Sequence, residues 1–411
     1  MQANKHICII TQSHLCRNPR VVKEARLLSR YYDITIINNT YDASLSIEDE
    51  ELIAGYNIKL ISIAQLQNKN FISITDRLIK KLADWLVKFI GIQTHLALGY
   101  GAGRFVSAAL KLNADAYIGH QELGLYCGCR LMEHGKRVGF DFEDWYSADL
   151  LPDAMSYRPV KLLRRLEKKA LQKGICNITT SNILAVELAG AYNCPEPTVV
   201  YNVFNKRDDL MQAGKTYEQP LKLFWFSQTI GRGRGLEQLI KLSAVVKFSL
   251  EIHLLGNIDI DFRSELIGII PAQHQLFFHG LVPDKQLADK IAGFDIGLAL
   301  ELATPPSRDL TITNKFFQYI QAGLPVIASH TQGQKEAFEK FKPGIMLSQH
   351  YSEDDGIQLS AWLSNQAELI AARERSIEAA QYYNWENQAN QLLSAASRLL
   401  EAPFNQTKHA C

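Results

Sequence analysis

One segment in the second half of the chain has residue types and spacing that suit an anion. Residues 307–329 read SRDLTITNKFFQYIQAGLPVIAS. The loop Thr311-Ile312-Thr313 carries two hydroxyl side chains and leads into a helix that we expect to begin near Asn314. A helix N-terminus presents free backbone N–H groups and a partial positive charge, which suit a pyrophosphate. The alternative is an ordinary strand–loop–helix connection that binds no ligand.

A second segment, FWFSQTIGRGRGLEQLI (224–240), predicts a strand, a glycine-rich loop and a helix that begins near Gly235. Glycines in such a loop let the backbone approach a ligand closely. Arg232 and Arg234 would neutralise a departing diphosphate, whose negative charge grows in the transition state. A Gly-Arg-Gly-Arg-Gly run is also typical of a flexible solvated loop, and this alternative stays open.

Carboxylates follow an apolar run in the first half, in GFDFEDWYSAD (139–149). The loop with Glu143 and Asp144 leaves the carboxyl end of a predicted strand that contains Asp141, and a carboxylate at Glu143 suits a general base for an inverting reaction. The alternative is that these are helix-capping or solvated loop charges. His120 follows another predicted strand, and we expect it to touch an acceptor.

These segments must be positioned by a repeated alternation of apolar runs and helical segments. Continuous apolar runs that alternate with helices predict parallel sheets covered on both faces. The expected strands are residues 6–11, 34–38, 58–63, 115–120, 137–142, 177–181 and 198–202, then 221–227, 250–256, 276–280, 294–300, 324–329 and 343–347.

The alternation stops at the polar residues 205–220, which we interpret as a linker between two doubly wound domains. The predicted domains are residues 1–205 and 206–384, and residues 385–411 form a closing helix and a loose tail after Pro403. Ligands of such sheets bind at the carboxyl ends of the strands, so we expect the site in the cleft between the domains.

The 307–329 segment resembles the donor-binding segment of retaining GT-B glycosyltransferases of family four, also known as glycosyl transferases group 1. That family has a pattern like N-K-x-x-E-Y-x-x-x-G-x-P-V-[IV]-[AG]-[ST]. Here Asn314-Lys315-Phe316-Phe317-Gln318-Tyr319 is followed by Gly323-Leu324-Pro325-Val326-Ile327-Ala328-Ser329. The resemblance extends in order over nearly the whole chain. It implies two Rossmann-like domains that face each other across a cleft, with a C-terminal helix that crosses back to the first.

The resemblance implies a nucleotide-sugar donor held by the second domain. Gln318 stands where the family usually has a Glu that holds the ribose hydroxyls, and Gln also suits this role. The partner Glu would fall at Leu310, which cannot do polar work, so the retaining outcome and the usual hexose donor are in doubt. The donor-binding residues implied are Ser227, Gln228, Arg232, Arg234, Thr311, Ile312, Thr313, Asn314, Lys315 and Gln318.

The first half resembles the acceptor domain of the same family. TQSHLCRNPRVVKEARLLS (11–29) is similar to its first strand–loop–helix, and GFDFEDWYSAD to its D-x-H-[DE]-x-[YF] segment, with Glu143 in place of the His. The implied catalytic residues are Glu143, Asp144 and Arg234. The implied acceptor-binding residues are Ser13, His14, His120 and Asp141.

The composition excludes several other classes. The 411 residues carry a net charge of +1, which gives no electrostatic case for nucleic acid. The start lacks a signal peptide and no apolar stretch is long enough to span a membrane. The seven cysteines form no disulfide framework, so we expect a reducing cytoplasm. We expect no metal and no cofactor, because arginines would neutralise the diphosphate, and we interpret Asp259-Ile260-Asp261 as part of a polar loop.

Residues 71–90, FISITDRLIKKLADWLVKFI, predict a basic amphipathic helix. Such a helix suits the inner face of a membrane, although a core-packed helix with a solvated face has the same pattern. The family resemblance implies a glycosyltransferase that acts on a glycan or lipid-linked acceptor in surface polysaccharide or glycoconjugate assembly.

Two other functions remain open. One is a sugar-nucleotide epimerase, which shares the architecture. The other is a degenerate protein that binds a nucleotide sugar or a partner without catalysis, which Leu310 and Gln318 favour. A nicotinamide-dependent oxidoreductase is disfavoured because no G-x-G-x-x-G follows the first strand.

Overall fold

The computed structural model describes residues 4–211 and 214–403. The chain divides into two compact units, of which the first holds residues up to Val200 and from Ala389 onward, and the second holds Tyr201–Gln388. The predicted domain limits at 205 and 384 lie a few residues from these divisions and stay predictions. The tail after Pro403, Cys411 and part of the predicted linker lie outside the described residues.

The first unit is built on a seven-stranded parallel sheet in the order β3-β2-β1-β4-β5-β6-β7. Its strands are β1 (His6–Ile10), β2 (Asp33–Thr40), β3 (Ile58–Gln65), β4 (Ala116–His120), β5 (Val138–Phe142), β6 (Cys176–Thr179) and β7 (Thr198–Val199). Strands β1, β4 and β5 are almost fully buried, which explains their continuous apolar runs.

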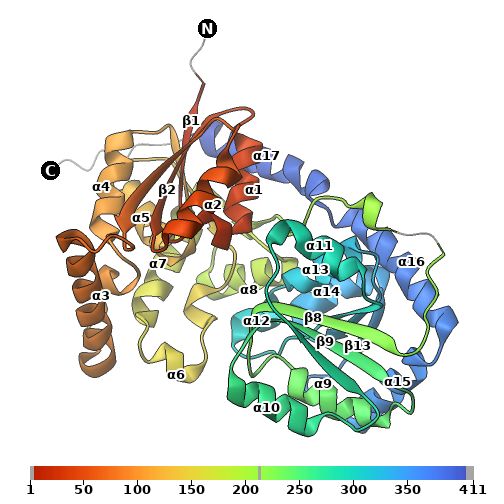
Figure 1. The fold of residues 1–411 in the computed structure, drawn as a ribbon. Helices are drawn as coiled ribbons and strands as arrows, with labels where there is room; N and C mark the ends of the chain where they lie inside the picture. The colour runs from red at the N-terminus through yellow and green to blue at the C-terminus, as the bar shows by residue number, and fades with distance from the viewer. Residues whose placement is uncertain (1–3, 212–213, 404–411) are drawn as a thin grey trace. The chain divides into compact units, whose positions relative to one another are not determined.

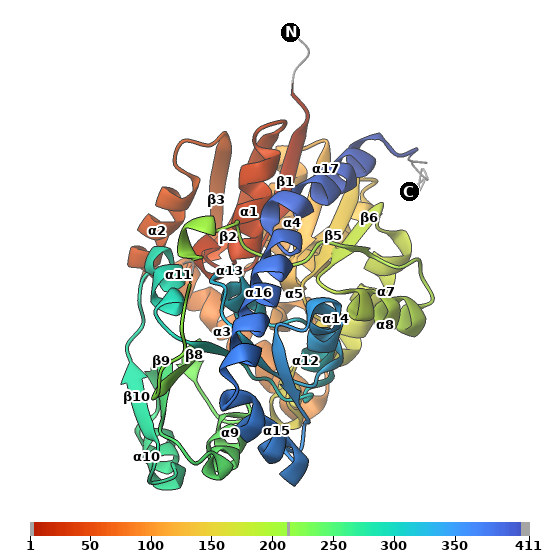
Figure 2. The same cartoon turned by 90° about the vertical axis from the view of Figure 1, so that its right-hand side faces the viewer.

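Helices cover both faces of this sheet (Figure 1). They are α1 (Pro19–Leu28), α2 (Ala43–Ile53), α3 (Phe71–Ile90), α4 (Ala102–Leu112), α5 (Gln121–Glu133), α6 (Pro152–Met155), α7 (Val160–Lys173), α8 (Asn182–Tyr192) and α17 (Trp385–Glu401). Ala396 and Leu399 of α17 share a core with Val21 of α1 and Ile7 of β1, so the C-terminal helix is part of the first unit's core (Figure 2).

The second unit is built on a six-stranded parallel sheet in the order β10-β9-β8-β11-β12-β13. Its strands are β8 (Leu221–Ile230), β9 (Leu250–Ile258), β10 (Gln275–His279), β11 (Ile296–Ala299), β12 (Val326–Ser329) and β13 (Gly344–Leu347). Every strand predicted from the sequence is present. Two parallel, doubly wound sheets therefore confirm the predicted pair of Rossmann-like domains.

The helices of the second unit lie on both faces of its sheet (Figure 1). They are α9 (Leu236–Leu242), α10 (Ile260–Ile269), α11 (Asp284–Ala292), α12 (Pro306–Leu310), α13 (Asn314–Gln321), α14 (Gln332–Phe341), α15 (Glu353–Leu363) and α16 (Gln366–Tyr382). Leu236, Phe262 and Leu359 pack on one face of the sheet, and Phe316 and Ala337 pack on the other.

One local prediction was wrong. Asp259, expected in a polar loop, is the N-cap of α10, and its carboxylate accepts hydrogen bonds from the backbone N–H groups of Asp261 and Phe262. The Asp-x-Asp spacing therefore belongs to a helix cap.

Candidate functional site

A cluster of cationic side chains surrounds one buried carboxylate in the second unit. Glu301 follows β11 and is only 4% exposed. Its Oε2 accepts a hydrogen bond of 2.6 Å from Nη1 of Arg234, and its Oε1 lies 3.6 Å from Nη1 of Arg308. Oε1 is buried without a hydrogen-bond partner within the described chain. A buried polar atom of this kind suits a site that a ligand or water completes.

Lys315 lies beside this carboxylate. Its Nζ is 5.0 Å from the ring centroid of the buried Trp225. Burial lowers the pKa of Lys315 to about 8, with Glu301 opposing the shift and Arg234 and Arg308 adding to it. Three cations thus face one carboxylate, and this excess positive charge favours an anionic ligand.

Strand ends and tight turns position the cluster. Gly235, with a φ of 82°, is the N-cap of α9 directly after Arg234. The positive φ favours glycine at this turn, and a Cβ at Gly235 would lie 2.9 Å from the hydroxyl of Tyr351, which would have to shift. The Oγ of Ser329, at the end of β12, accepts the backbone N–H of Glu301 at 3.0 Å. These contacts fix Glu301 where the carboxyl ends of β8, β11 and β12 meet.

The loop before α13 lies as the sequence predicts. Thr313 is the N-cap residue of α13, and its side chain makes no capping hydrogen bond to the helix. Its Oγ1 instead donates to Oε1 of Gln334 at 3.2 Å. Ile312 is buried, whereas Thr311 is partly and Asn314 largely exposed. The N-terminal N–H groups of α13 thus lie next to Lys315, an arrangement that suits phosphate oxygens.

Gln318 stands one turn further along α13. Its Oε1 is buried and has no hydrogen-bond partner within the described chain. Leu310 is 5% exposed and packs as an ordinary core residue. The neighbouring Asp309 accepts hydrogen bonds from the backbone and side chain of Gln332, so it caps α14. Neither residue 309 nor residue 310 replaces the second Glu of the family pattern here.

The remaining residues that the sequence predicts to bind the donor do not all lie in the cluster around Glu301. Arg232 pairs with Glu265 at 2.6 Å and stacks on Phe262, away from Glu301. Ser227 and Gln228 lie within β8, which continues to Ile230, at a register shift between β8 and β9. The structure therefore brings Arg234 and Lys315 together with Arg308 and Glu301, and leaves Arg232 outside that cluster.

A second group of ionisable side chains lies at the carboxyl ends of β4 and β5 in the first unit. His120 is fully buried, with Nε2 2.6 Å from Oε2 of Glu24 and Nδ1 3.1 Å from Oε1 of Glu143. Burial alone would lower the pKa of His120, but Glu24, Glu143 and Asp141 outweigh it and raise the pKa to about 10. His120 is therefore an imidazolium that donates to two carboxylates at neutral pH.

Asp141 is held by an arginine rather than exposed. Its carboxylate accepts two hydrogen bonds from Arg20, at 2.5 and 3.1 Å, and Arg20 also donates to the carbonyl of Val200 at 2.7 Å. Burial raises the pKa of Asp141 to about 6, although the charge of Arg20 opposes this shift. The fork-shaped pairing buries both charges together.

Glu143 and Asp144 have opposite electrostatic environments. Burial opposes the charged form of Glu143, but the hydrogen bond and charge of His120 prevail and lower its pKa. Oε1 of Glu143 also accepts 2.9 Å from Nδ2 of Asn18. Burial, reinforced by Asp149, instead raises the pKa of Asp144 well above its usual value. Glu143 is thus a fixed anion, and Asp144 has the greater proton affinity.

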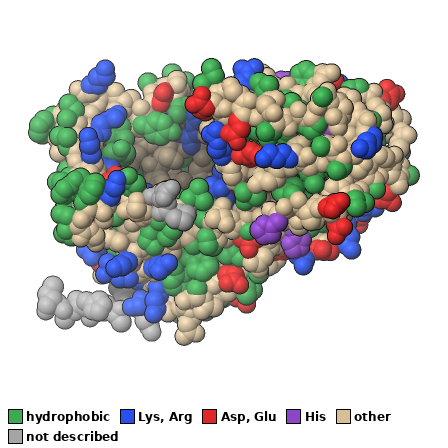
Figure 3. Space-filling model, turned by 90° about the horizontal axis from the view of Figure 1, so that it is seen from below, with side chains coloured by type: hydrophobic (Ala, Val, Ile, Leu, Met, Phe, Trp, Pro, Cys, Tyr) green, Lys and Arg blue, Asp and Glu red, His purple; other side chains and the backbone are tan. Residues whose placement is uncertain are grey.

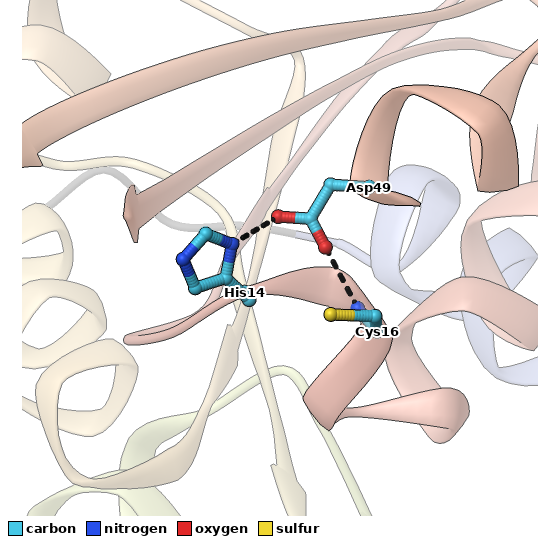
Figure 4. A group of neighbouring side chains, drawn as sticks. All are labelled: His14, Cys16 and Asp49. Atoms are coloured by element: carbon cyan, nitrogen blue, oxygen red, sulfur yellow. Dashed lines mark hydrogen bonds and ion pairs between the residues drawn. The ribbon is translucent and has the colours of Figure 1, made fainter. Parts of the chain in front are cut away.

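His14 is enclosed near the start of α1 (Figure 4). Its Nδ1 lies 2.7 Å from Oδ2 of Asp49, and Nε2 accepts the backbone N–H groups of Tyr41 and Asp42 at 2.9 and 3.2 Å. Both ring nitrogens of His14 are therefore engaged in hydrogen bonds within the first unit. The preceding Ser13 is partly exposed. Acceptor binding by Ser13 and His14 stays a prediction.

Among the described residues, two groups have the composition of a metal site, His14–Cys16–Asp49 and Glu24–His120–Asp141. In the first, the ring nitrogens of His14 are both engaged, and Asp49 accepts the backbone N–H of Cys16 at 2.8 Å. Burial raises the pKa of the Cys16 thiol to about 12, which disfavours the thiolate that a metal needs. In the second, both nitrogens of His120 face carboxylates.

Sequence reasoning missed Glu301, Arg308, Arg20 and Glu24 as parts of these clusters. Glu301 and Arg308 lie beside the predicted loop, and an acid just after a buried strand was an available signal for Glu301. Arg20 and Glu24 lie on α1, where a charged residue normally faces solvent. Their burial follows from contacts far apart in the sequence, which no local pattern carries.

Comparisons with known proteins support the fold. No protein-family model matches the sequence, and no curated protein matches it. Among solved structures, sucrose-phosphate synthase from Thermosynechococcus elongatus is 15% identical with a TM-score of 0.70, covering 97% of this chain and 100% of that one. Anabaena HepE in complex with UDP-glucose is 15% identical with a TM-score of 0.65, covering 95% and 99%.

A putative UDP-N-acetylglucosamine 2-epimerase from Listeria monocytogenes is also similar. It is 11% identical with a TM-score of 0.57, and 97% of each chain is covered. At these identities the similarity concerns the fold. The resemblance to GT-B glycosyltransferases of the group 1 type is confirmed at that level.

Proposed function

We propose that this protein transfers a sugar from a nucleoside diphosphate sugar to a glycan or lipid-linked acceptor. In this proposal the second unit binds the donor, and the first unit binds the acceptor. The observation that carries the proposal is the cluster of Arg234, Arg308 and Lys315 around Glu301. Its excess positive charge complements a diphosphate, whose negative charge increases as the glycosidic bond to phosphate breaks.

The proposed reaction is a substitution at the anomeric carbon. The acceptor hydroxyl oxygen forms a bond to that carbon, the bond from the carbon to the diphosphate oxygen breaks, and the electron pair leaves with the diphosphate. The hydroxyl proton passes to a base. Arg234, Lys315 and the N-terminal N–H groups of α13 stabilise the departing charge. With these groups present, the proposal requires neither a metal nor a cofactor.

Between the two carboxylates proposed near the reacting centre, the environments suggest different roles. Glu143 is fixed by His120 and Asn18, and its lowered pKa makes it a weak base. It suits binding of an acceptor hydroxyl. The raised pKa of Asp144 favours its protonated form, so Asp144 must lose its proton before it can act as a base. We propose Glu143 or Asp144 as the general base if the outcome is inversion.

Gln318 is the proposed ligand of the ribose, because its Oε1 is buried and lacks a partner within the described chain. The similar HepE structures contain UDP, UDP-glucose or UDP with glucose. We therefore propose UDP as the first nucleotide to test, and a hexose as the transferred sugar.

We place this activity in surface polysaccharide or glycoconjugate assembly, in the cytoplasm and at the inner face of the cell membrane. The six cysteines in the described part of the chain are free thiols, which suits a reducing compartment. None of the described helices is long and apolar enough to cross a membrane. Contact with a membrane surface through residues 71–90 belongs to this proposal.

The donor site is tested by thermal unfolding of the purified protein with UDP, GDP, CMP, ADP and dTDP. One nucleotide should raise the melting temperature, and Arg234→Ala should remove the increase. Arg263→Ala is a matched control, because Arg263 is an exposed arginine of the same unit that stacks on Phe278. If none of the nucleotides stabilises the wild-type protein, the donor site is wrong.

The epimerase neighbour keeps a second enzyme class under consideration. An epimerase would convert a nucleotide sugar into its isomer, or hydrolyse it, without any acceptor. Product analysis after incubation with the stabilising nucleotide's sugar, with and without membrane extract, separates the two reactions. Turnover that requires the extract supports transfer, whereas an isomer formed without extract supports epimerisation. Binding without turnover in either mixture supports the non-catalytic alternative.

A further inference from the structure

Helix α3 carries the largest continuous set of exposed apolar side chains that we find in the described chain. Its outward residues are Phe71 (84% exposed), Ile72, Ile74, Leu78 (62%), Ile79, Leu82 (58%), Trp85 (48%), Phe89 and Ile90. Six of them (71, 74, 78, 82, 85 and 89) recur at intervals of three and four residues, and the three isoleucines at 72, 79 and 90 widen the same face, so together they form one broad stripe along the helix. An exposed apolar area of this extent marks an interaction surface in a water-soluble fold.

The opposite face of α3 attaches the helix to the first unit. Ala83 and Val87 pack against Ala97 in a small core of their own. Asp76 pairs with Arg104, and Ser73 is buried at the start of the helix. Because small residues make this attachment, the large apolar residues are left on the outside. The stripe is therefore not the core-facing side of the helix.

Cations border the stripe on one side. Arg77, Lys81 and Lys88 lie at intervals of four and seven residues and are all exposed. Arg77 donates to the carbonyl of Leu66, and Lys88 donates to the hydroxyl of Tyr157, so both contact neutral oxygens. The acidic residues of the helix are engaged elsewhere, since Asp84 pairs with Lys80 and Asp76 with Arg104. The border is thus positively charged.

Two aromatic side chains of the stripe contact each other near this border. Trp85 and Phe89 contact each other, with ring centroids 5.6 Å apart, and Lys88 lies 5.0 Å above the ring of Phe89 and 4.2 Å above that of Tyr157. Figure 3 shows hydrophobic side chains gathered on the left of the view, with Lys and Arg side chains between them. An apolar face, interfacial aromatics and a cationic rim together fit a lipid surface.

We propose that the outer face of α3 docks in the plane of an anionic lipid bilayer. Phe71, Leu78, Leu82 and Trp85 enter the boundary between headgroups and acyl chains, while Arg77, Lys81 and Lys88 contact anionic headgroups. A helix of 20 residues is about 30 Å long, so the whole stripe lies along the surface. A second copy of this chain would cover the apolar stripe but would bring two cationic borders close together, which disfavours that occupant.

Docking of α3 on a bilayer identifies a lipid as the carrier of the acceptor, and that part of the inference rests on the proposed function. A sugar acceptor carried by a lipid would be presented at the surface that α3 contacts. The docking itself depends only on the exposed residues of α3, so it is tested independently of nucleotide binding.

The test is cosedimentation of the full-length protein with vesicles of phosphatidylcholine alone and with added phosphatidylglycerol. The wild-type protein should sediment with the anionic vesicles and much less with the neutral ones. A variant with Phe71→Ser, Leu78→Ser, Leu82→Ser and Trp85→Ser should stay in the supernatant. Lys81→Gln should lower the partition coefficient on anionic vesicles about fivefold and change that on neutral vesicles little.

The matched control replaces four exposed isoleucines outside α3, namely Ile47→Ser, Ile260→Ser, Ile267→Ser and Ile357→Ser. It should bind vesicles as the wild type does. If the fourfold α3 variant does not fold, Phe71→Ser alone, at the most exposed position, should reduce binding severalfold. Binding that is equal for wild type and α3 variants would overturn the proposal. So would a wild-type dimer in light scattering that the α3 variant abolishes, without any vesicle binding.

The two proposals fail separately. Nucleotide stabilisation of the fourfold α3 variant equal to that of the wild type, with vesicle binding lost, supports docking through α3 as a separate function. Vesicle binding by a wild-type protein that no nucleotide stabilises supports the docking and contradicts the proposed donor site. Nucleotide stabilisation without vesicle binding by the wild type contradicts the docking alone.

Discussion

At the scale of single residues, the cationic side chains around Glu301 carry positive charge that this one carboxylate only partly compensates. Glu301 pairs with Arg234 and lies near Arg308, and Lys315 is held over Trp225 beside them. Burial and the neighbouring cations lower the pKa of Lys315. A bound anion would reverse this effect, because negative charge favours the ammonium form.

Lys315 therefore predicts how nucleotide binding depends on pH. The ammonium form binds the anion, and as pH rises through about 8 the free protein loses that proton. The dissociation constant of the stabilising nucleotide should increase about tenfold between pH 7 and pH 9. Lys315→Arg should remove most of this dependence, because arginine stays charged. Titrations at both pH values measure it, and an equal increase in the variant would contradict this role.

The buried pair of Arg20 and Asp141 predicts that replacing Arg20 lowers the stability of the protein rather than its affinity for a ligand. Removing it leaves the buried carboxylate of Asp141 without its partner, at a cost of about 3–5 kcal/mol in the free energy of unfolding. Urea unfolding of Arg20→Leu tests this value. Arg17→Leu is the matched control, because Arg17 is exposed one turn earlier, and it should change stability by about 0.5 kcal/mol or less. A loss of less than about 1 kcal/mol for Arg20→Leu would contradict the role given to this pair.

At the scale of elements, the turn between β8 and α9 sets the direction of Arg234. Gly235 adopts a positive φ and lies against Tyr351, whereas Gly231 in the same loop does not have a positive φ and has open space around it. Of the three glycines in this loop, Gly233 and Gly235 therefore have a positive φ that favours glycine, whereas the geometry does not require Gly231.

Gly235→Ala should lower both stability and nucleotide binding. An alanine with positive φ costs about 1–2 kcal/mol, and its Cβ would displace the Tyr351 hydroxyl. The melting temperature should fall by about 2–4 °C for each kcal/mol, and nucleotide stabilisation should decrease. Gly231→Ala should change neither. Equal effects of the two substitutions would show that the turn does not position Arg234.

The helices, strands and loops also show which features of the fold could be predicted from the sequence. Buried strands such as β1 and β12 were predictable because parallel strands need continuous apolar runs. The N-cap of α10 was missed because the sequence around Asp259 has the composition of a polar loop. Only the hydrogen bonds from the backbone to Asp259 distinguish a helix cap from such a loop. The loop before α13 was predictable from its hydroxyl residues. Glu301 had a signal as an acid just after a buried strand, but its contact with Arg234 was not predictable, since it depends on β8 and β11 being neighbours in the sheet.

At the scale of the whole molecule, the near-neutral chain contains local concentrations of charge with different roles. The net charge is +1, so binding of an anion must come from particular side chains rather than from a general field. The second unit has an excess of cations around Glu301. The first unit has a buried network in which His120 and Arg20 balance carboxylates. Its helix α3 adds an apolar surface with a cationic border.

Calorimetric titration with nucleoside diphosphates and monophosphates is the most direct test of the central claim, that the second unit binds the diphosphate of a sugar donor. We predict that one nucleoside diphosphate binds at one site per chain, and that its monophosphate binds at least about tenfold more weakly, because the cation cluster contacts the diphosphate. Arg234→Ala should abolish this preference, and Arg263→Ala should leave it unchanged. No binding, or equal affinity for the monophosphate and the diphosphate, would contradict the account.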